Sequence, residues 1–185
     1  MNAVLLTDAS NMRGNLPRYL PGAVATNPPL DLTLTPINGP GRSVSAWISM
    51  FHLVFVALDP RNERSRWILD TAMRIFATYD EADCRVAWLV AGDAADARRF
   101  LGDLADEVLT FLDPDSAAIR AFGLSSLPAI VHLGVDGSIV NAVEGWDPPG
   151  WRKLTDELSR ILKWTQPPIP WSTDPRPFEG APLSA

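Results

Sequence analysis

The centre of the chain alternates between apolar, β-type runs and amphipathic helical stretches, and this alternation restricts the folds it can adopt. Leu53–Leu58 (LVFVAL) and Cys84–Ala91 (CRVAWLVA) are apolar runs rich in β-branched and aromatic residues, as expected of strands covered on both faces. Between them, Glu63–Tyr79 carries apolar side chains at helical spacing. Strands separated by a helix pair in parallel through a right-handed crossover, so the sequence predicts a βαβ unit inside an α/β domain.

The alternation continues towards the C-terminus. Asp93 is expected to cap a helix that reaches about Asp106. Pro114 is expected to lie in the first turn of a further helix, which Gly123 closes. The remaining predicted elements are strands at Pro29–Thr35, Leu109–Leu112, Ala129–Leu133 and Ser138–Glu144, a turn at Asp136-Gly137, and a last helix that starts at Asp147. We expect a central sheet of about five strands, with helices on both faces.

Proline divides the chain into three parts. Of the 17 prolines, six precede residue 46 and six follow residue 164. The sequence therefore predicts an N-terminal arm (1–27), a folded domain (28–164) and a C-terminal arm (165–185), both arms being irregular and rich in proline.

Composition and charge exclude several classes of partner. The 22 acidic and 16 basic residues give a net charge of −6, which argues against nucleic acid or an anionic membrane, because both need clustered Lys and Arg. The longest apolar stretch, Phe51–Leu58, is far too short to insert into a membrane directly. Met1–Gly22 does not have the pattern of a secretory signal, and the chain has one cysteine, so we expect a cytoplasmic location, which includes peripheral attachment to a membrane complex.

Four segments, within Pro28–Trp164, resemble the redoxin branch of the thioredoxin superfamily, which holds the TlpA-like thiol–disulfide oxidoreductases and the peroxiredoxins. They are PLDLTLTPINGPGRSVSAW, LVFVALDP, DPDSAAIRAFGLSSLPAIVHL and VDGSIVNAVEGW. The resemblance implies a thioredoxin-like fold with an N-terminal β-hairpin. It also implies that the bond Leu127-Pro128 is cis and faces the active-site loop, where the family's proline helps to bind extended peptide.

The loop that would carry the family's chemistry contains no thiol. In the family a C-x-x-C pair or a single peroxidatic cysteine follows the strand that matches Leu53–Leu58. Here the loop consists of Asp59, Pro60, Arg61, Asn62, Glu63, Arg64 and Ser65. The cysteine positions fall on Arg61 and Arg64 or, one residue later, on Asn62 and Ser65, and none of these side chains can replace a thiol in disulfide exchange. The sequence thus predicts that this is not a thiol–disulfide enzyme.

Other candidate groups are weaker. Cys84 begins an inner strand away from the loop and is expected to be a small buried residue, and His52 and His132 lie in predicted strands. No spacing suggests a metal site or a cofactor site, and Ser125-Ser126 has no base nearby in the sequence. Arg61, Arg64 and Arg66 could bind a phosphate or carboxylate. Alternatively, they could lie on a solvated surface turn, with Arg64 or Arg66 paired to Glu63 or Asp70.

The two arms combine prolines with large apolar side chains, a composition that suits docking on another protein. The candidate partner-binding residues are Leu16, Pro17, Tyr19, Leu20, Trp164, Ile169, Trp171 and Phe178. We expect these segments to lie on a partner surface and not to complete the core of this domain.

Two hypotheses follow. The first is a non-catalytic thioredoxin-like module for protein–protein contact, an accessory subunit or assembly factor of a larger complex, with a respiratory or redox complex, bound through its cytoplasmic face, as one candidate host. The second is an enzyme or sensor that binds an anionic small molecule in the redoxin cleft through the Arg-rich loop. A redox protein that works through Cys84 ranks below both.

Overall fold

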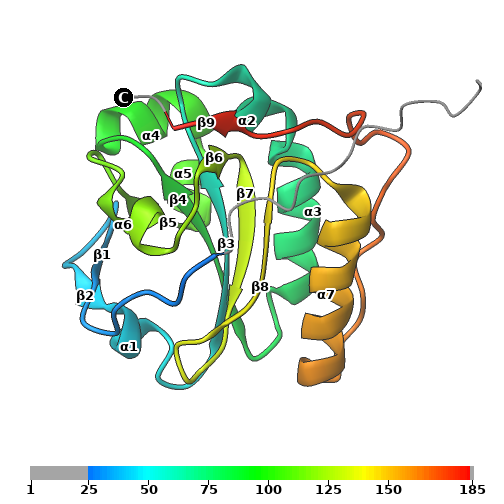
Figure 1. Cartoon of the computed structure of the whole chain (residues 1–185), viewed down its shortest axis with the longest axis horizontal. Helices are drawn as coiled ribbons and strands as arrows, with labels where there is room; N and C mark the ends of the chain where they lie inside the picture. Colours follow the sequence, from blue (N-terminus) through cyan, green and yellow to red (C-terminus); the bar gives the residue numbers. More distant parts are fainter. Residues whose placement is uncertain (1–24, 184–185) are drawn as a thin grey trace, which may run out of the picture.

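The computed structural model describes residues 25–183 and contains a seven-stranded sheet in the order β2-β1-β5-β4-β3-β7-β8 (Figure 1). Its strands are β1 (Thr33–Pro36), β2 (Arg42–Ser43), β3 (His52–Leu58), β4 (Cys84–Val90), β5 (Leu109–Leu112), β7 (Ala129–Leu133) and β8 (Ile139–Glu144). A separate pair is formed by β6 (Ser126–Leu127) and β9 (Ala181–Pro182). The helices are α1 (Val44–Trp47), α2 (Glu63–Trp67), α3 (Leu69–Tyr79), α4 (Ala94–Leu101), α5 (Leu104–Glu107), α6 (Ala117–Ala121) and α7 (Pro148–Leu162).

The predicted βαβ unit is confirmed. β3 pairs with β4 in parallel over seven residues, and β4 pairs in parallel with β5. β7 runs antiparallel to β3, and β8 antiparallel to β7, so that these five strands form the expected central sheet. The N-terminal hairpin β1–β2 extends the sheet at the β5 edge. This is the thioredoxin-like arrangement that the resemblance implies.

Two apolar layers cover the sheet, and they contain different helices. On one face, α3, α4, α5 and α7 pack on Val54, Val56 and Trp88, and Figure 1 shows α3 and α7 side by side. On the other face, α1 and α6 pack on Phe55 and Leu89. Within residues 25–183, no helix is long and apolar enough to cross a membrane.

Two predicted helices are interrupted. The helix expected over Glu63–Tyr79 breaks at Ile68 into α2 and α3, where Ser65 is buried and its hydroxyl accepts the Asp59 amide proton at 3.0 Å. Neither proline nor glycine signals this break. The helix expected to reach Asp106 ends instead at Gly102, whose φ of +61° lies in the region that glycine alone adopts without strain, and α5 follows.

The start of α6 also differs from the prediction. Pro114 does not open the helix; α6 begins at Ala117, because Ser116 has a φ of 55° and interrupts the helical backbone before it. The Asp113 carboxylate accepts the amide protons of Ala118 and Ile119 at 3.0 and 2.8 Å and so caps this helix from outside. The first strand is shorter than expected, since a turn closed by the Leu32 amide on the Pro29 carbonyl precedes it.

The C-terminal arm packs against its own domain, which corrects the expectation that it would not complete the core. Ile169 is 4% exposed and belongs to the core layer of α3 and α7. Its carbonyl accepts a hydrogen bond from Arg152 of α7, and the Pro168 carbonyl accepts one from Arg74 of α3. An extended backbone presents free carbonyls, and these two arginines satisfy them.

The other residues predicted to bind a partner through the arms differ in how far they are buried. Phe178 is partly buried against the same core layer, whereas Trp164 and Trp171 remain 39% and 53% exposed. Leu16, Pro17, Tyr19 and Leu20 lie outside the described residues.

An ion pair fixes the middle of the arm to α3. Arg74 Nη2 lies 2.6 and 2.7 Å from the two carboxylate oxygens of Asp174, and the Thr71 hydroxyl donates to the same carboxylate at 2.7 Å. The Asp174 side chain is 2% exposed. Burial alone would raise the pKa of Asp174, but hydrogen bonds from Arg74, Thr71 and the Trp171 amide together hold it below its ordinary value.

Two histidines, His52 at the start of β3 and His132 of β7, form a pair of which His132 is buried and His52 is half-buried. His52 Nδ1 lies 2.9 Å from His132 Nε2, and His132 is fully buried. Among residues 25–183, nothing bonds to His132 Nδ1. Burial, and then the field of His52, lowers the pKa of His132 to about 4, so both rings are neutral near pH 7. The expectation of core histidines is confirmed for His132.

The Arg74–Asp174 pair predicts a specific acid sensitivity. Because the carboxylate is favoured in the folded state, its stabilisation is complete above the unfolded pKa of about 4 and is lost as the pH falls through the lower folded value. We expect Asp174→Asn to reduce the free energy of unfolding by about 3 kcal/mol at pH 7, and this difference to shrink below pH ~4. Urea titrations measure it. The exposed Asp31→Asn control should stay within about 0.5 kcal/mol of wild type, and a difference for Asp174→Asn that is constant with pH would contradict the assignment.

The histidine pair predicts a second, separate pH window. Between pH ~6.5 and ~4 the unfolded chain binds a proton at His132 that the folded chain does not, so stability falls as the pH falls through this range. We expect the loss to be on the order of 3 kcal/mol and to be largely removed in His132→Leu. The slope of unfolding free energy against pH measures it, and equal slopes in the two proteins would refute the burial argument.

Candidate functional site

The loop that matches the redox site of the resembling family connects β3 to α2. Asn62 occupies the N-cap of α2, and its side-chain oxygen accepts the Arg64 amide proton at 3.0 Å. Ser65 lies one turn further along and is fully buried. Since a reactive cysteine belongs at a helix N-terminus, this placement favours the register in which Asn62 and Ser65 occupy the cysteine positions. An amide and a hydroxyl replace the two thiols.

The second loop of the site contains Leu127-Pro128, and this peptide bond is cis, as the resemblance implies. The Leu127 carbonyl accepts a hydrogen bond from Asn62 Nδ2 at 3.4 Å. The two loops therefore lie against each other at the carboxyl end of β3, as expected. Leu127 itself is buried in the core layer of α6.

The C-terminal arm closes the site, and this arrangement was not predicted. β9 pairs antiparallel with β6, with Ala181 opposite Leu127. Arg64 donates a hydrogen bond to the Glu179 carbonyl at 2.8 Å, and the rings of Trp67 and Phe178 meet edge to face at 5.4 Å between centroids. In Figure 1 the red β9 segment passes beside α2 and β6. The edge of the site is thus covered by the chain itself.

The arginines of the loop bind groups of this chain. Arg61 lies 3.4 Å from the Asp59 carboxylate, and Arg64 binds the arm as described. Arg66 donates to the Phe100 carbonyl at 3.3 Å and lies over the Phe100 ring. None of the three forms an ion pair with Glu63 or Asp70 in the described part of the chain, so the pairing suggested from the sequence is wrong. Their three separate partners do not make a common anion site.

A carboxylate unrecognised from the sequence lies beside the cis-proline loop. Glu144 of β8 accepts hydrogen bonds from the Ser125 amide at 2.6 Å and from the hydroxyls of Ser125 and Ser126 at 2.9 and 2.8 Å. These bonds hold β6 against β8, and the 18- and 19-residue separations explain why local sequence did not show them. The serines donate to a carboxylate that fixes the loop, which is a structural role.

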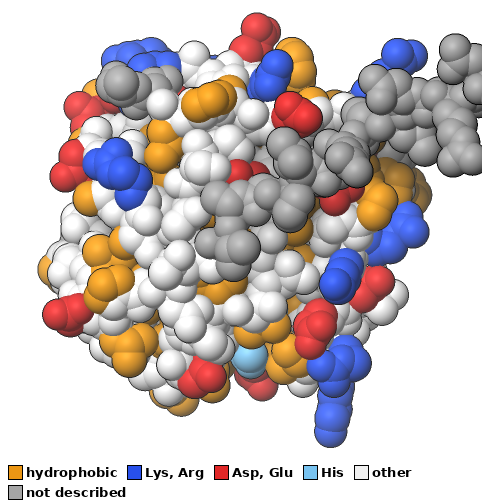
Figure 2. Space-filling model, viewed as in Figure 1, with side chains coloured by type: hydrophobic (Ala, Val, Ile, Leu, Met, Phe, Trp, Pro, Cys, Tyr) orange, Lys and Arg blue, Asp and Glu red, His pale blue; other side chains and the backbone are white. Residues whose placement is uncertain are grey.

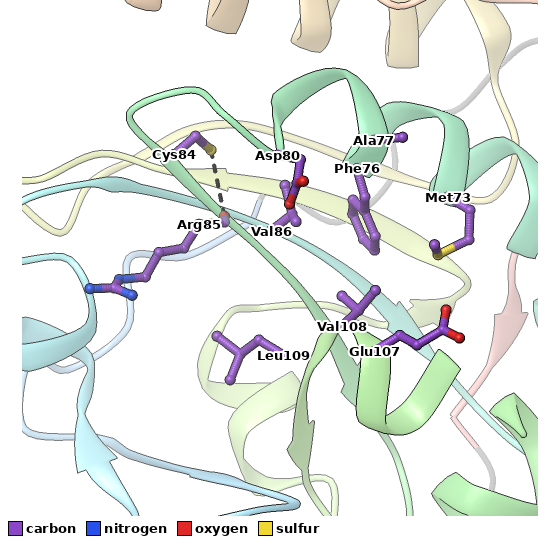
Figure 3. A pocket seen from close by; sticks show the side chains of 10 residues that line it. All are labelled: Met73, Phe76, Ala77, Asp80, Cys84, Arg85, Val86, Glu107, Val108 and Leu109. Atoms are coloured by element: carbon purple, nitrogen blue, oxygen red, sulfur yellow. Dashed lines mark hydrogen bonds between the residues drawn. The ribbon is translucent and has the colours of Figure 1, made fainter. Parts of the chain in front are cut away.

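Cys84 is remote from this site. It is the first residue of β4 and lies opposite His52, whereas the loop follows Leu58, so about 20 Å of strand separates them. Cys84 lines a groove of about 450 Å³, and its thiol donates a hydrogen bond to the Arg85 carbonyl. Figure 3 shows Cys84 and Met73 at opposite ends of this groove. Burial raises the pKa of Cys84 to about 12, which keeps the thiol protonated and unreactive. Within residues 25–183, His, Cys, Asp and Glu do not form a group of three that could hold a metal ion.

Comparison with known proteins places the fold. No protein-family model and no curated protein matches the sequence. Among solved structures, a putative protein disulfide isomerase from Bacteroides thetaiotaomicron is similar with a TM-score of 0.63 and 16% identity over 77% of this chain and 93% of that chain. A putative thiol:disulfide interchange protein DsbE from Chlorobium tepidum has a TM-score of 0.62 and 16% identity over 76% and 99%.

A third similar structure belongs to the peroxiredoxins. Peroxiredoxin Q from Xanthomonas campestris has a TM-score of 0.58 and 17% identity over 76% of this chain and 96% of that chain. The structural neighbours therefore include both thiol–disulfide proteins and a peroxiredoxin, the two kinds of redoxin that the sequence resembles. With the single cysteine of this chain at the far end of β4, the protein has the thioredoxin-like fold of the redoxins without their redox-active cysteine pair.

Proposed function

We propose that the protein is a non-catalytic thioredoxin-like module for protein–protein contact, an accessory subunit or assembly factor of a larger complex. One observation carries this proposal: the loop that corresponds to the redox site contains no thiol, and the chain's own C-terminal arm binds along its edge. Disulfide exchange needs an accessible thiolate, so a loop without a thiol can offer a partner a binding surface but cannot exchange disulfides. A respiratory or redox complex, contacted from its cytoplasmic side, is a candidate host by analogy with the fold.

Exposed tryptophans offer a surface for the partner. Trp171 is 53% exposed, and its amide donates to Asp174 at 2.6 Å, while the Trp164 indole donates to the Thr78 carbonyl at 2.7 Å. The Trp164 side chain and the Trp171 backbone are thereby held in place before any partner binds, which lowers the entropy lost on association. Basic residues are scattered over the face shown in Figure 2, and this distribution favours a protein over a nucleic acid.

The anion-binding hypothesis ranks second. It needs the guanidinium groups of Arg61, Arg64 and Arg66 to converge on one ligand, but each binds a different group of the chain. No other observation favours a small-molecule substrate, so the interaction module is the better supported function.

The proposal predicts which surface residue binds the partner. In affinity purification from the native source, the wild-type chain should return a stoichiometric partner, and Trp171→Ala should weaken that binding by about 2 kcal/mol or more. Met50→Ala is the matched control, since Met50 is 75% exposed and apolar but precedes β3 and is not part of the arm. Equal recovery of a partner with both variants would move the interface elsewhere, and purification of the chain alone would refute the proposed function.

Because the loop has no thiolate, we expect the protein to lack thiol–disulfide and peroxidase activity. Purified protein should show no catalysis of insulin disulfide reduction or of peroxide turnover, because Cys84 stays protonated at neutral pH and lies far from the cis-proline loop. Alkylation of Cys84 should be much slower than that of a free thiol until the protein is unfolded. Turnover that disappears in Cys84→Ser would show that this thiol is reactive and would contradict the assignment.

A further inference from the structure

The last part of the arm, Pro175–Leu183, forms a strap across the site, and its closest approach requires glycine. A Cβ atom on Gly180 would lie 2.6 Å from Ser126 Oγ and 3.2 Å from the Gly145 nitrogen. A Cβ atom on Gly145 would in turn lie 2.6 Å from the Gly180 nitrogen and from the Phe178 carbonyl oxygen. A side chain at this position would displace the Ser126 hydroxyl from its bond to Glu144, so the surface beneath the strap favours a segment with glycine here.

The side chains of Phe178 and Leu183 and the backbone make the remaining contacts of the strap. Phe178 exchanges two backbone hydrogen bonds with Trp146, at 2.8 and 3.1 Å, and places its ring against Trp67. Arg64 binds the carbonyl of Glu179, not its exposed side chain. Recognition thus depends on an extended backbone with the pattern aromatic, any residue, glycine, and the residue between the aromatic and the glycine is free to vary.

The strap is less deeply buried than the segment before it. Phe178 and Leu183 pack partly against the two core layers and Trp146 Nε1 donates to the Pro175 carbonyl at 2.9 Å, but no residue of 175–183 is fully buried, whereas Ile169 and the Asp174 side chain are. A segment with few buried apolar contacts opens locally at lower free energy than the core. The Arg74–Asp174 ion pair would keep the arm attached while the strap detaches.

We propose that the strap is an internal competitor for an extended segment of a partner protein that carries this aromatic-x-Gly pattern. When the strap lifts, that segment pairs antiparallel with β6, places its aromatic ring on Trp67, and accepts a hydrogen bond from Arg64. The inference extends the proposed function from an unspecified partner to a class of peptide and a second contact surface, distinct from the exposed Trp171.

The test uses the purified full chain and a labelled peptide of residues 175–183, PRPFEGAPL, as the probe. Gly180→Val in the chain should expel its own strap by the contacts given above, whereas Glu179→Val, next to it and exposed, should not. A tethered strap acts at an effective concentration of about 1 mM, so we expect the peptide to bind Gly180→Val about tenfold or more tightly than wild type or Glu179→Val. A peptide that carries valine in place of its glycine should not bind.

Phe178→Ala provides a second release variant if circular dichroism shows that Gly180→Val is unfolded, because it removes the ring that packs on Trp67 and on the edge of the α3 and α7 layer without adding an atom. Equal affinity for wild type and the folded release variant, or binding to neither, would overturn the inference. The assay contains only purified components, so its outcome does not depend on whether affinity purification returns a partner. A peptide that binds while no partner is recovered would support the strap and refute the wider function.

Discussion

The parallel pairing of β3 with β4 is the constraint on which the rest of the structure depends. Both strands are covered on both faces, so the side chains that point to either face must be apolar. Val54, Phe55 and Val56, which are consecutive in β3, are accordingly all fully or almost fully buried. A parallel pair needs a crossover, and α2 and α3 supply it. The crossover begins with the loop after β3, so the parallel pairing by itself places this loop at the carboxyl end of β3, whether or not the loop carries a thiol.

The replacement of the thiols changes what the site can do while preserving its geometry. Asn62 caps α2 and also donates to the Leu127 carbonyl, so one amide holds the helix and the cis-proline loop together. Ser65 accepts the Asp59 amide proton in the buried position behind it. These polar side chains satisfy backbone groups that would otherwise be buried without partners. The loop is therefore a stable structural element, and its surface is available for binding without redox chemistry.

The sequence predicted the parts of the fold that depend on local pattern and missed those that depend on distant contacts. Apolar runs and helical spacing located β3, β4 and α7, and the cis bond at Pro128 followed from the resemblance. The break at Ile68 did not follow, because the bond between Ser65 and the Asp59 amide that accompanies it appears only in the folded chain. Glu144 was missed for the same reason, since its serine partners are on another strand. The role of the arm was mistaken because its prolines and aromatics are equally compatible with docking on a partner and on the domain.

That last ambiguity has a physical origin. An extended segment held open by prolines has free carbonyls and widely spaced apolar side chains, and it fits any surface that offers matching donors and pockets. Arg74, Arg152 and Arg64 provide such donors on this domain, at intervals along one path from α3 and α7 to β6. The path ends at an edge where two glycines, Gly145 and Gly180, allow backbones to approach without side chains between them. Such an edge selects a segment by its extended backbone and by a glycine at the point of closest approach. A segment of another protein with the same features would meet the same arginine donors and the same space.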